Sequence, residues 1–111
     1  MFYGIRKERI EGFNRALQTL RETFSLVFAN DMVITLDKNM SFYDDARFMA
    51  AFNGEATNEQ EASLIWRLHV LCWCAETALR REGDFVECGV YRGFSSRVAA
   101  RYLDFARQPK Q

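Results

Sequence analysis

The chain has 111 residues, of which 49% are hydrophobic and 14% aromatic, so it is expected to fold as a globular domain and not as a disordered tail. Its 15 basic and 15 acidic residues balance, which argues against a nucleic-acid interface and against electrostatic binding to a membrane. No apolar run approaches the roughly 20 residues that span a bilayer. The first nine residues also lack the apolar core of a signal peptide.

The cysteines indicate a reducing environment. There are three of them, Cys72, Cys74 and Cys88, and the first two lie close together on a predicted helix. An odd number with this spacing is a poor disulfide framework and suits an intracellular protein. We therefore predict a cytoplasmic location.

The first predicted helix runs from Arg6 to Phe24. Apolar residues recur in it at steps of three and four, which is the pattern of one face of an amphipathic helix. The residues of this stripe are Ile10, Phe13, Leu17, Leu20 and Phe24.

A short strand and a second helix are predicted next. Residues 31–36 are rich in β-branched side chains and are followed by a polar turn, which is typical of a strand. Ser41 can cap a helix that continues to about Phe52. The pair Asn53-Gly54 is then expected to end that helix.

A long helix is predicted from Thr57 to about Arg81. Thr57 and Gln60 have the spacing of a capping box, and Gly83 follows the last turn. The seven-residue spacing of Trp66 and Trp73 places both on one face of this helix, where core or interface packing explains them better than cofactor stacking does.

His69 and Cys72 lie one turn apart on the same predicted helix. Such a pair can supply two metal ligands, but the sequence offers no evident third or fourth. A core-facing cysteine beside a half-buried histidine is the simpler interpretation.

The stretch GDFVECGVYRGFSS, residues 83–96, carries the chemistry of the chain. Residues 84–88 are expected to form a buried strand with Glu87 near its end, and a helix is expected from Phe94. A buried carboxylate is costly unless it serves a partner or a ligand. Gly89 permits a tight turn with positive φ, and Gly93 leaves room where the helix begins.

The helix that follows this turn completes a small polar cradle. Its first turn presents free N–H groups, and Ser95 and Ser96 add hydroxyl donors. Beside the negative charge of Glu87, such a cradle suits a ligand that bears both a carboxylate and an ammonium group. The dinucleotide fingerprint G-x-G-x-x-G is absent, because Tyr91 and Phe94 stand where it requires glycine.

These residues resemble motif I of the class I S-adenosylmethionine-dependent methyltransferases, in the form found in the macrocin (TylF-like) O-methyltransferases. The preceding IWRLHVLCWCAETALRREGDF resembles the helix that leads into that motif. The resemblance covers residues 57–105 and implies that Glu87, Gly89, Gly93 and Ser95 line the methionine end of the cofactor. The chain departs from the family at Phe94, where a second glycine is usual.

The resemblance also implies an α/β fold, with N-terminal helices that lead into the first strand, turn and helix of a Rossmann-like sheet. Residues 1–56 would form an N-terminal helical or lid segment, and residues 57–111 would begin the cofactor-binding domain. A single strand cannot form a parallel sheet, so the chain either pairs with another copy or is the N-terminal part of a longer protein, and the second is favoured. In the family, the ribose-binding acid, the acidic ligands of Mg²⁺ and the catalytic base follow this region.

The function that the resemblance implies is transfer of a methyl group from S-adenosyl-L-methionine to a hydroxyl of a sugar or small metabolite. Two alternatives do not depend on that cofactor. One is a helical protein-interaction module that uses the amphipathic N-terminal helix and the tryptophan face. The other is a different nucleotide-binding α/β protein, against which the missing glycine fingerprint argues.

Overall fold

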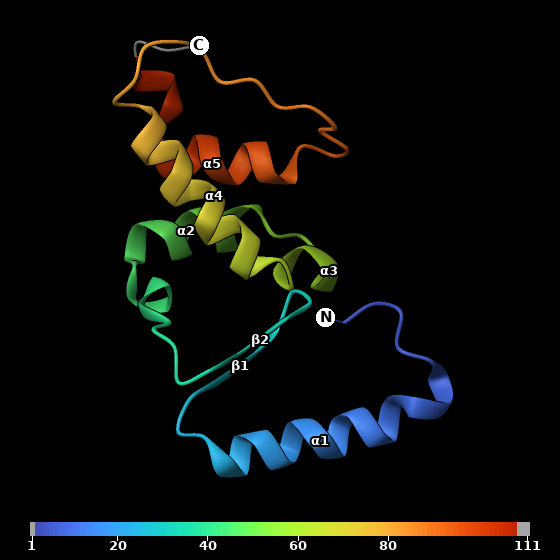
Figure 1. The fold of residues 1–111 in the computed structure, drawn as a ribbon. Helices are drawn as coiled ribbons and strands as arrows, with labels where there is room; N and C mark the ends of the chain where they lie inside the picture. Colours follow the sequence, from blue (N-terminus) through green and yellow to red (C-terminus); the bar gives the residue numbers. More distant parts are fainter. Residues whose placement is uncertain (1, 109–111) are drawn as a thin grey trace. The chain divides into compact units, whose positions relative to one another are not determined.

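The computed structural model describes residues 2–108, and the chain forms two compact units, Met1–Met40 and Ser41–Gln111 (Figure 1). The predicted division between residues 56 and 57 falls inside the second unit, between α2 and α3. In chain order the elements are η1 (Lys7–Arg9), α1 (Ile10–Thr23), β1 (Val27–Asn30), β2 (Val33–Leu36), η2 (Ser41–Asp44), α2 (Ala46–Glu55), α3 (Glu59–Ala62), α4 (Ile65–Ala78), α5 (Phe94–Leu103) and η3 (Phe105–Arg107).

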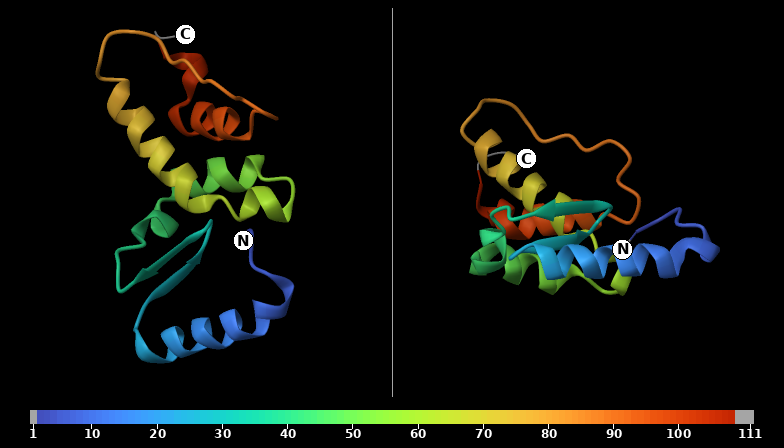
Figure 2. Two further views of the ribbon diagram at one scale, coloured as in Figure 1. Left: turned by 45° about the vertical axis from the view of Figure 1, so that its right-hand side comes forward. Right: turned by 60° about the horizontal axis from the view of Figure 1, so that its bottom comes forward.

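The first unit consists of α1 followed by a β-hairpin, whose two strands Figure 2 shows side by side. β1 and β2 pair in antiparallel fashion, with Val27 opposite Leu36. Asp31 and Met32 join them with φ angles of 49° and 59°, as a two-residue type I′ turn requires. The predicted strand is therefore confirmed for its last four residues. Its first two residues form the turn instead, and β1 was not predicted.

Helix α1 confirms the first predicted helix, which begins as the short η1. Its apolar stripe gives α1 a clear amphipathic character, yet none of its residues is buried. The ring of Phe13 contacts the ring of Phe2, at 5.1 Å between centroids. Ile10, in the first turn, remains 42% exposed.

The core of the second unit lies where α5 packs against α2 and α4. Phe48 of α2 is 2% exposed, and its ring contacts Phe52, His69 and Tyr102 at centroid distances of 5.7, 6.4 and 6.5 Å. The aromatic contacts therefore join all three helices. The buried apolar residues of this unit are Phe48, Ala51, Phe52, Ile65, Leu68, Cys72, Ala75, Phe94, Val98, Tyr102 and Leu103.

Helix α2 begins and ends later than predicted. Asp45, and not Ser41, is its N-cap, because the Asp45 carboxylate accepts a hydrogen bond of 3.0 Å from the amide of Phe48. Gly54 lies within the last turn and does not end the helix. A Cβ at Gly54 would come within 2.8 Å of the Arg101 guanidinium, so this glycine permits close packing of α2 against α5.

The long predicted helix is interrupted. Asn58 caps α3 by accepting from the amide of Glu61, while the Glu61 carboxylate accepts from both the amide and the hydroxyl of Thr57. The capping box thus lies one residue later than the predicted Thr57–Gln60 pair. A turn at residues 63–64 separates α3 from α4, which ends at Ala78.

A polar network crosses the second unit between α2, α4 and α5. Arg47 forms an ion pair of 2.6 Å with Glu76, and its guanidinium lies 4.0 Å from the centre of the Tyr102 ring. The Tyr102 hydroxyl donates to the second oxygen of the Glu76 carboxylate at 3.0 Å. These hydrogen bonds, first from Arg47 and then from Tyr102, lower the pKa of Glu76. One carboxylate therefore ties three helices together.

Because the pKa of Glu76 is lower in the folded state, its contribution to stability is present above the carboxyl's unfolded pKa, near 4.3, and is lost as the pH falls through the folded value. We expect Glu76→Gln to lower the free energy of unfolding at pH 7 by about 1 kcal/mol or less, since the pair is partly exposed. The difference from the wild type should shrink at an acid pH that lies below the folded pKa of Glu76. Urea unfolding at both pH values measures it, and an equal difference at both would contradict this role.

The predicted strand at residues 84–88 is wrong for this structure. These residues have no regular secondary structure, and every residue from Arg81 to Arg92 is exposed. Figure 1 shows the segment as an open connection from α4 to α5. A strand needs a neighbour to satisfy its backbone N–H and C=O groups, and no strand of residues 2–108 pairs with it.

The fold class predicted from the sequence is confirmed at its coarser level, since the chain combines helices with strands. The sheet, however, is a two-stranded antiparallel hairpin, and the parallel sheet is not present among the described residues.

Helix α5 confirms the helix predicted from Phe94 and buries Phe94, Val98 and Tyr102. None of the helices in residues 2–108 is long and apolar enough to span a membrane.

Candidate functional site

The candidate site is formed by Glu87 and the first turn of α5. The Ser95 hydroxyl donates to Oε1 of Glu87 at 3.1 Å, and the Ser96 hydroxyl donates to Oε2. The prediction that Glu87 lies in a buried strand is wrong, because the residue is exposed. Its carboxylate is instead oriented by two hydroxyls at a helix N-terminus, where a negative charge is favoured. Glu87 and Ser95, which the sequence predicted as site residues, are therefore in contact.

Gly89 and Gly93 shape the turn between them. Their φ angles are +76° and +73°, in the left-handed region that glycine adopts without strain. The amide of Gly93 donates to the carbonyl of Val90 at 2.8 Å and closes the turn. A Cβ at Gly89 would meet no atom within 4 Å, and one at Gly93 would make only ordinary contacts. Backbone conformation, and not crowding within the chain, therefore requires glycine here.

Arg97 of α5 is hydrogen-bonded to this turn and was not among the site residues predicted from the sequence. Its Nη1 donates to the carbonyl of Arg92 at 2.6 Å, and its Nε donates to Glu55 at 3.0 Å. Glu55 also accepts from Arg101 at 3.0 Å. Hydrogen bonds from Arg101 and then Arg97 lower the pKa of Glu55. The only sequence signal for Arg97 and Arg101 was their spacing of one helical turn.

An apolar pocket of about 380 Å³ lies beside the site. Glu87 and Ser96 lie at its polar side, and the extended segment contributes Phe85 and Val86. Val86 is 84% exposed, so this segment leaves apolar surface uncovered next to the carboxylate. The apolar lining comes from α4, α5 and η3 and consists of Leu71, Ala75, Ala99, Ala100, Leu103 and Phe105.

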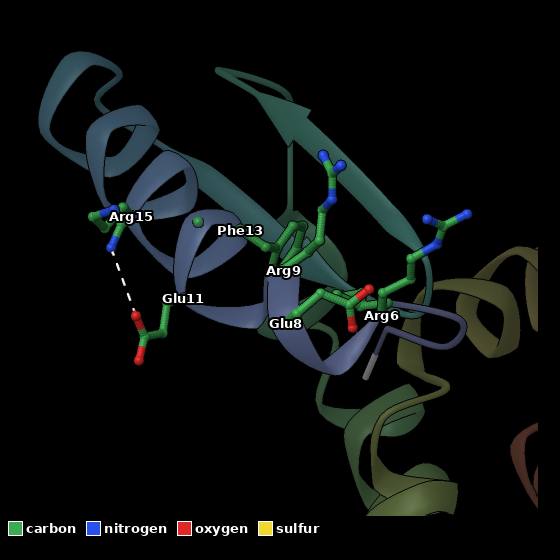
Figure 3. A pocket seen from close by; sticks show the side chains of 8 residues that line it. Arg6, Glu8, Arg9, Glu11, Phe13 and Arg15 are labelled. Atoms are coloured by element: carbon green, nitrogen blue, oxygen red, sulfur yellow. Dashed lines mark ion pairs between the residues drawn. The ribbon is translucent and has the colours of Figure 1, made fainter.

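A larger hollow of about 820 Å³ lies along α1 in the first unit (Figure 3). Its charged side chains have both signs, and Arg15 and Glu11 within it lie 3.9 Å apart. An ion pair between side chains as exposed as these contributes little to stability. None of the predicted site residues lines it.

The remaining candidates on α4 have structural explanations. Cys72 is buried, and burial raises the pKa of its thiol to about 12, so it packs in the core as expected. His69 is partly buried and stacks on Phe42 at 4.1 Å, and burial lowers its pKa. Within residues 2–108, no three His, Cys, Asp or Glu residues are grouped to hold a metal ion. Trp66 contacts Phe42 and His69, whereas Trp73 is 66% exposed.

The cysteines are free, with Cys72 buried and Cys74 and Cys88 exposed. Cys88 was expected to be a small buried residue at a strand end, and that expectation is wrong. Its exposure follows from the open conformation of residues 84–88.

Comparison with known proteins identifies no relative. The sequence matches no protein-family model, and neither a curated protein nor a solved structure is significantly similar to it.

Proposed function

We propose that the chain carries the S-adenosylmethionine-binding start of a class I methyltransferase of the macrocin O-methyltransferase type. The observation that supports this most directly is the contact of Glu87 with Ser95 and Ser96. It brings the acid of the motif to the N-terminus of α5, across a turn whose two glycines both have positive φ. The closeness of an acid, a glycine turn and a helix N-terminus supports the proposal.

The residues of the site fit the charges of the methionine end of the ligand. Glu87 is an exposed carboxylate that can accept from an ammonium group, and the first-turn amides of α5 can donate to a carboxylate. On ligand binding, the Ser95 hydroxyl would donate to the ligand carboxylate and no longer to Glu87. A Cβ added at Gly89 would meet no atom within 4 Å, so there is room for a ligand to approach the backbone there.

S-Adenosyl-L-methionine supplies an electrophilic methyl group when bound. The residues of this chain would hold and orient the methionine moiety, which contributes by fixing the geometry of an in-line displacement. The proposal further assigns a hydroxyl of a sugar or small metabolite as the acceptor, a cytoplasmic location, and Mg²⁺ bound outside these residues. It also requires strands that pair with residues 84–88, which the described part of the chain does not supply.

The proposal is tested by calorimetric titration of the protein with S-adenosylhomocysteine. We expect binding that NAD does not compete with, and an affinity reduced by about tenfold or more in Glu87→Gln, since a charge-assisted hydrogen bond is lost. The exposed Glu82→Gln, outside the motif turn, is the matched control and should bind as the wild type does. Because the site requires strands that pair with residues 84–88, no heat of binding with a protein that supplies those strands would refute the proposal.

A helical interaction module is the second candidate, and one observation favours it. No residue of α1 is buried, although the helix has a clear apolar stripe, and Trp73 on α4 is also exposed. Uncovered apolar faces of this kind are typical of binding surfaces. This candidate predicts concentration-dependent self-association in sedimentation and no affinity for S-adenosylhomocysteine. A monomer at all concentrations that does bind that ligand would exclude it.

A further inference from the structure

We infer that Arg97 is a positioning residue, which fixes the Gly89–Gly93 turn to helix α2 through Glu55 and so sets the ligand-binding conformation of the loop. This inference rests on the proposed function of the Glu87 site. Arg97 lies in the first turns of α5, close after Ser95 and Ser96 in the chain. Its guanidinium donates both to the turn, at the Arg92 carbonyl, and to the Glu55 carboxylate.

The Arg97 guanidinium joins the turn and helix α2 through its two hydrogen bonds. A guanidinium is planar and rigid, so a single Arg97 side chain fixes the Arg92 carbonyl relative to Glu55. Both bonds are charge-assisted, which makes them stronger than the neutral bond that closes the turn from Gly93 to Val90. Residues 89–92 are exposed and have little packing of their own, so the bond from Arg97 restrains a segment that the core does not hold.

Arg101 separates the positioning role from simple helix packing. It binds the same Glu55 carboxylate at the same distance of 3.0 Å, one helical turn further along α5. Among the described contacts, its guanidinium has no bond to the turn. Removal of either arginine therefore weakens the attachment of α2 to α5, but only removal of Arg97 frees the Arg92 carbonyl.

The test compares Arg97→Met, Arg97→Lys and Arg101→Met in the intact protein. The first readout is the ¹⁵N order parameter of residues 90–93 without ligand, which is expected to fall from about 0.85 toward 0.6 in Arg97→Met only. The second is the affinity for S-adenosylhomocysteine, which is expected to fall about tenfold in Arg97→Met and to be unchanged in Arg101→Met. Arg97→Lys, which can donate to one partner but not bridge both, should lie between them.

The two readouts distinguish failure of the inference from failure of the proposed function. Unchanged order parameters in Arg97→Met, or an equal fall in Arg101→Met, would overturn the positioning role. A fall confined to Arg97→Met, in a protein that does not bind S-adenosylhomocysteine, would uphold the role of Arg97 in fixing the turn while refuting the ligand. Because the Arg97 side chain is 43% exposed, its variants are expected to fold.

Discussion

Replacement of Phe48 by alanine is expected to lower the free energy of unfolding by about 3–5 kcal/mol, the range measured for aromatic truncations in cores. Phe48 is 2% exposed and its ring contacts aromatic side chains of α2, α4 and α5. The truncation leaves a cavity where the three helices meet, and the surrounding rings cannot close it without leaving their rotamers. Urea unfolding followed by far-ultraviolet circular dichroism measures the loss. A domain of ordinary stability, about 5–15 kcal/mol, would lose a large share of it.

Trp73→Ala is the matched control for this prediction. Both substitutions remove an aromatic ring from a helix of the second unit. Because Trp73 is 66% exposed, its replacement is expected to lower the free energy of unfolding by about 0.5 kcal/mol or less. Equal losses for the two variants would contradict the assignment of Phe48 to the centre of the core. A large loss for Trp73 alone would show that its face of α4 is covered in the intact protein.

Helical periodicity predicted the helices of this chain because apolar residues recur along one helical face, whether that face is buried, as in α5, or exposed, as in α1. The predicted stripe at Phe94, Val98 and Tyr102 is the buried face of α5, and the amphipathic N-terminal pattern corresponds to α1. The errors in the helices lie at the helix ends, where several residues compete as caps, and at residues 63–64, where a turn divides the predicted long helix. Helix α2 is capped by Asp45 and not by the predicted Ser41. The capping box of α3 is formed by Asn58 and Glu61 and not by Thr57 and Gln60. Side-chain geometry decides between such neighbouring candidates.

The site was predicted in part, for a different physical reason. Ser95 and Glu87 were expected to lie together because a tight glycine turn joins an extended segment to a helix, and the structure brings them into contact. Burial of residues 84–88 was not realised, since a strand depends on partners distant in sequence. Arg97 and Glu55 could not be paired from the sequence, because 42 residues separate them and only the packing of α2 on α5 brings them together.

Gly89→Val is expected to abolish measurable binding of S-adenosylhomocysteine, a loss of about 100-fold or more, while the helices remain folded. The side chain would occupy the space beside the backbone that a ligand must enter, and a β-branched residue is strained at a φ of +76°. The strain affects an exposed loop that makes no contribution to the buried core, so the circular dichroism of the helices should be unchanged. Calorimetric titration beside the wild type measures the loss.

Gly83→Val separates loss of the ligand space from strain of the backbone. Gly83 also has a positive φ, of +112°, and a Cβ there would likewise meet no atom within 4 Å, but it lies before the extended segment and away from the glycine turn. Strain alone would therefore destabilise both variants, by about 1–3 kcal/mol each. Loss of ligand affinity in Gly89→Val with normal affinity in Gly83→Val would support the methionine-binding turn, because only that glycine borders the proposed site. Normal affinity in Gly89→Val would place the ligand, if one binds, elsewhere on the chain.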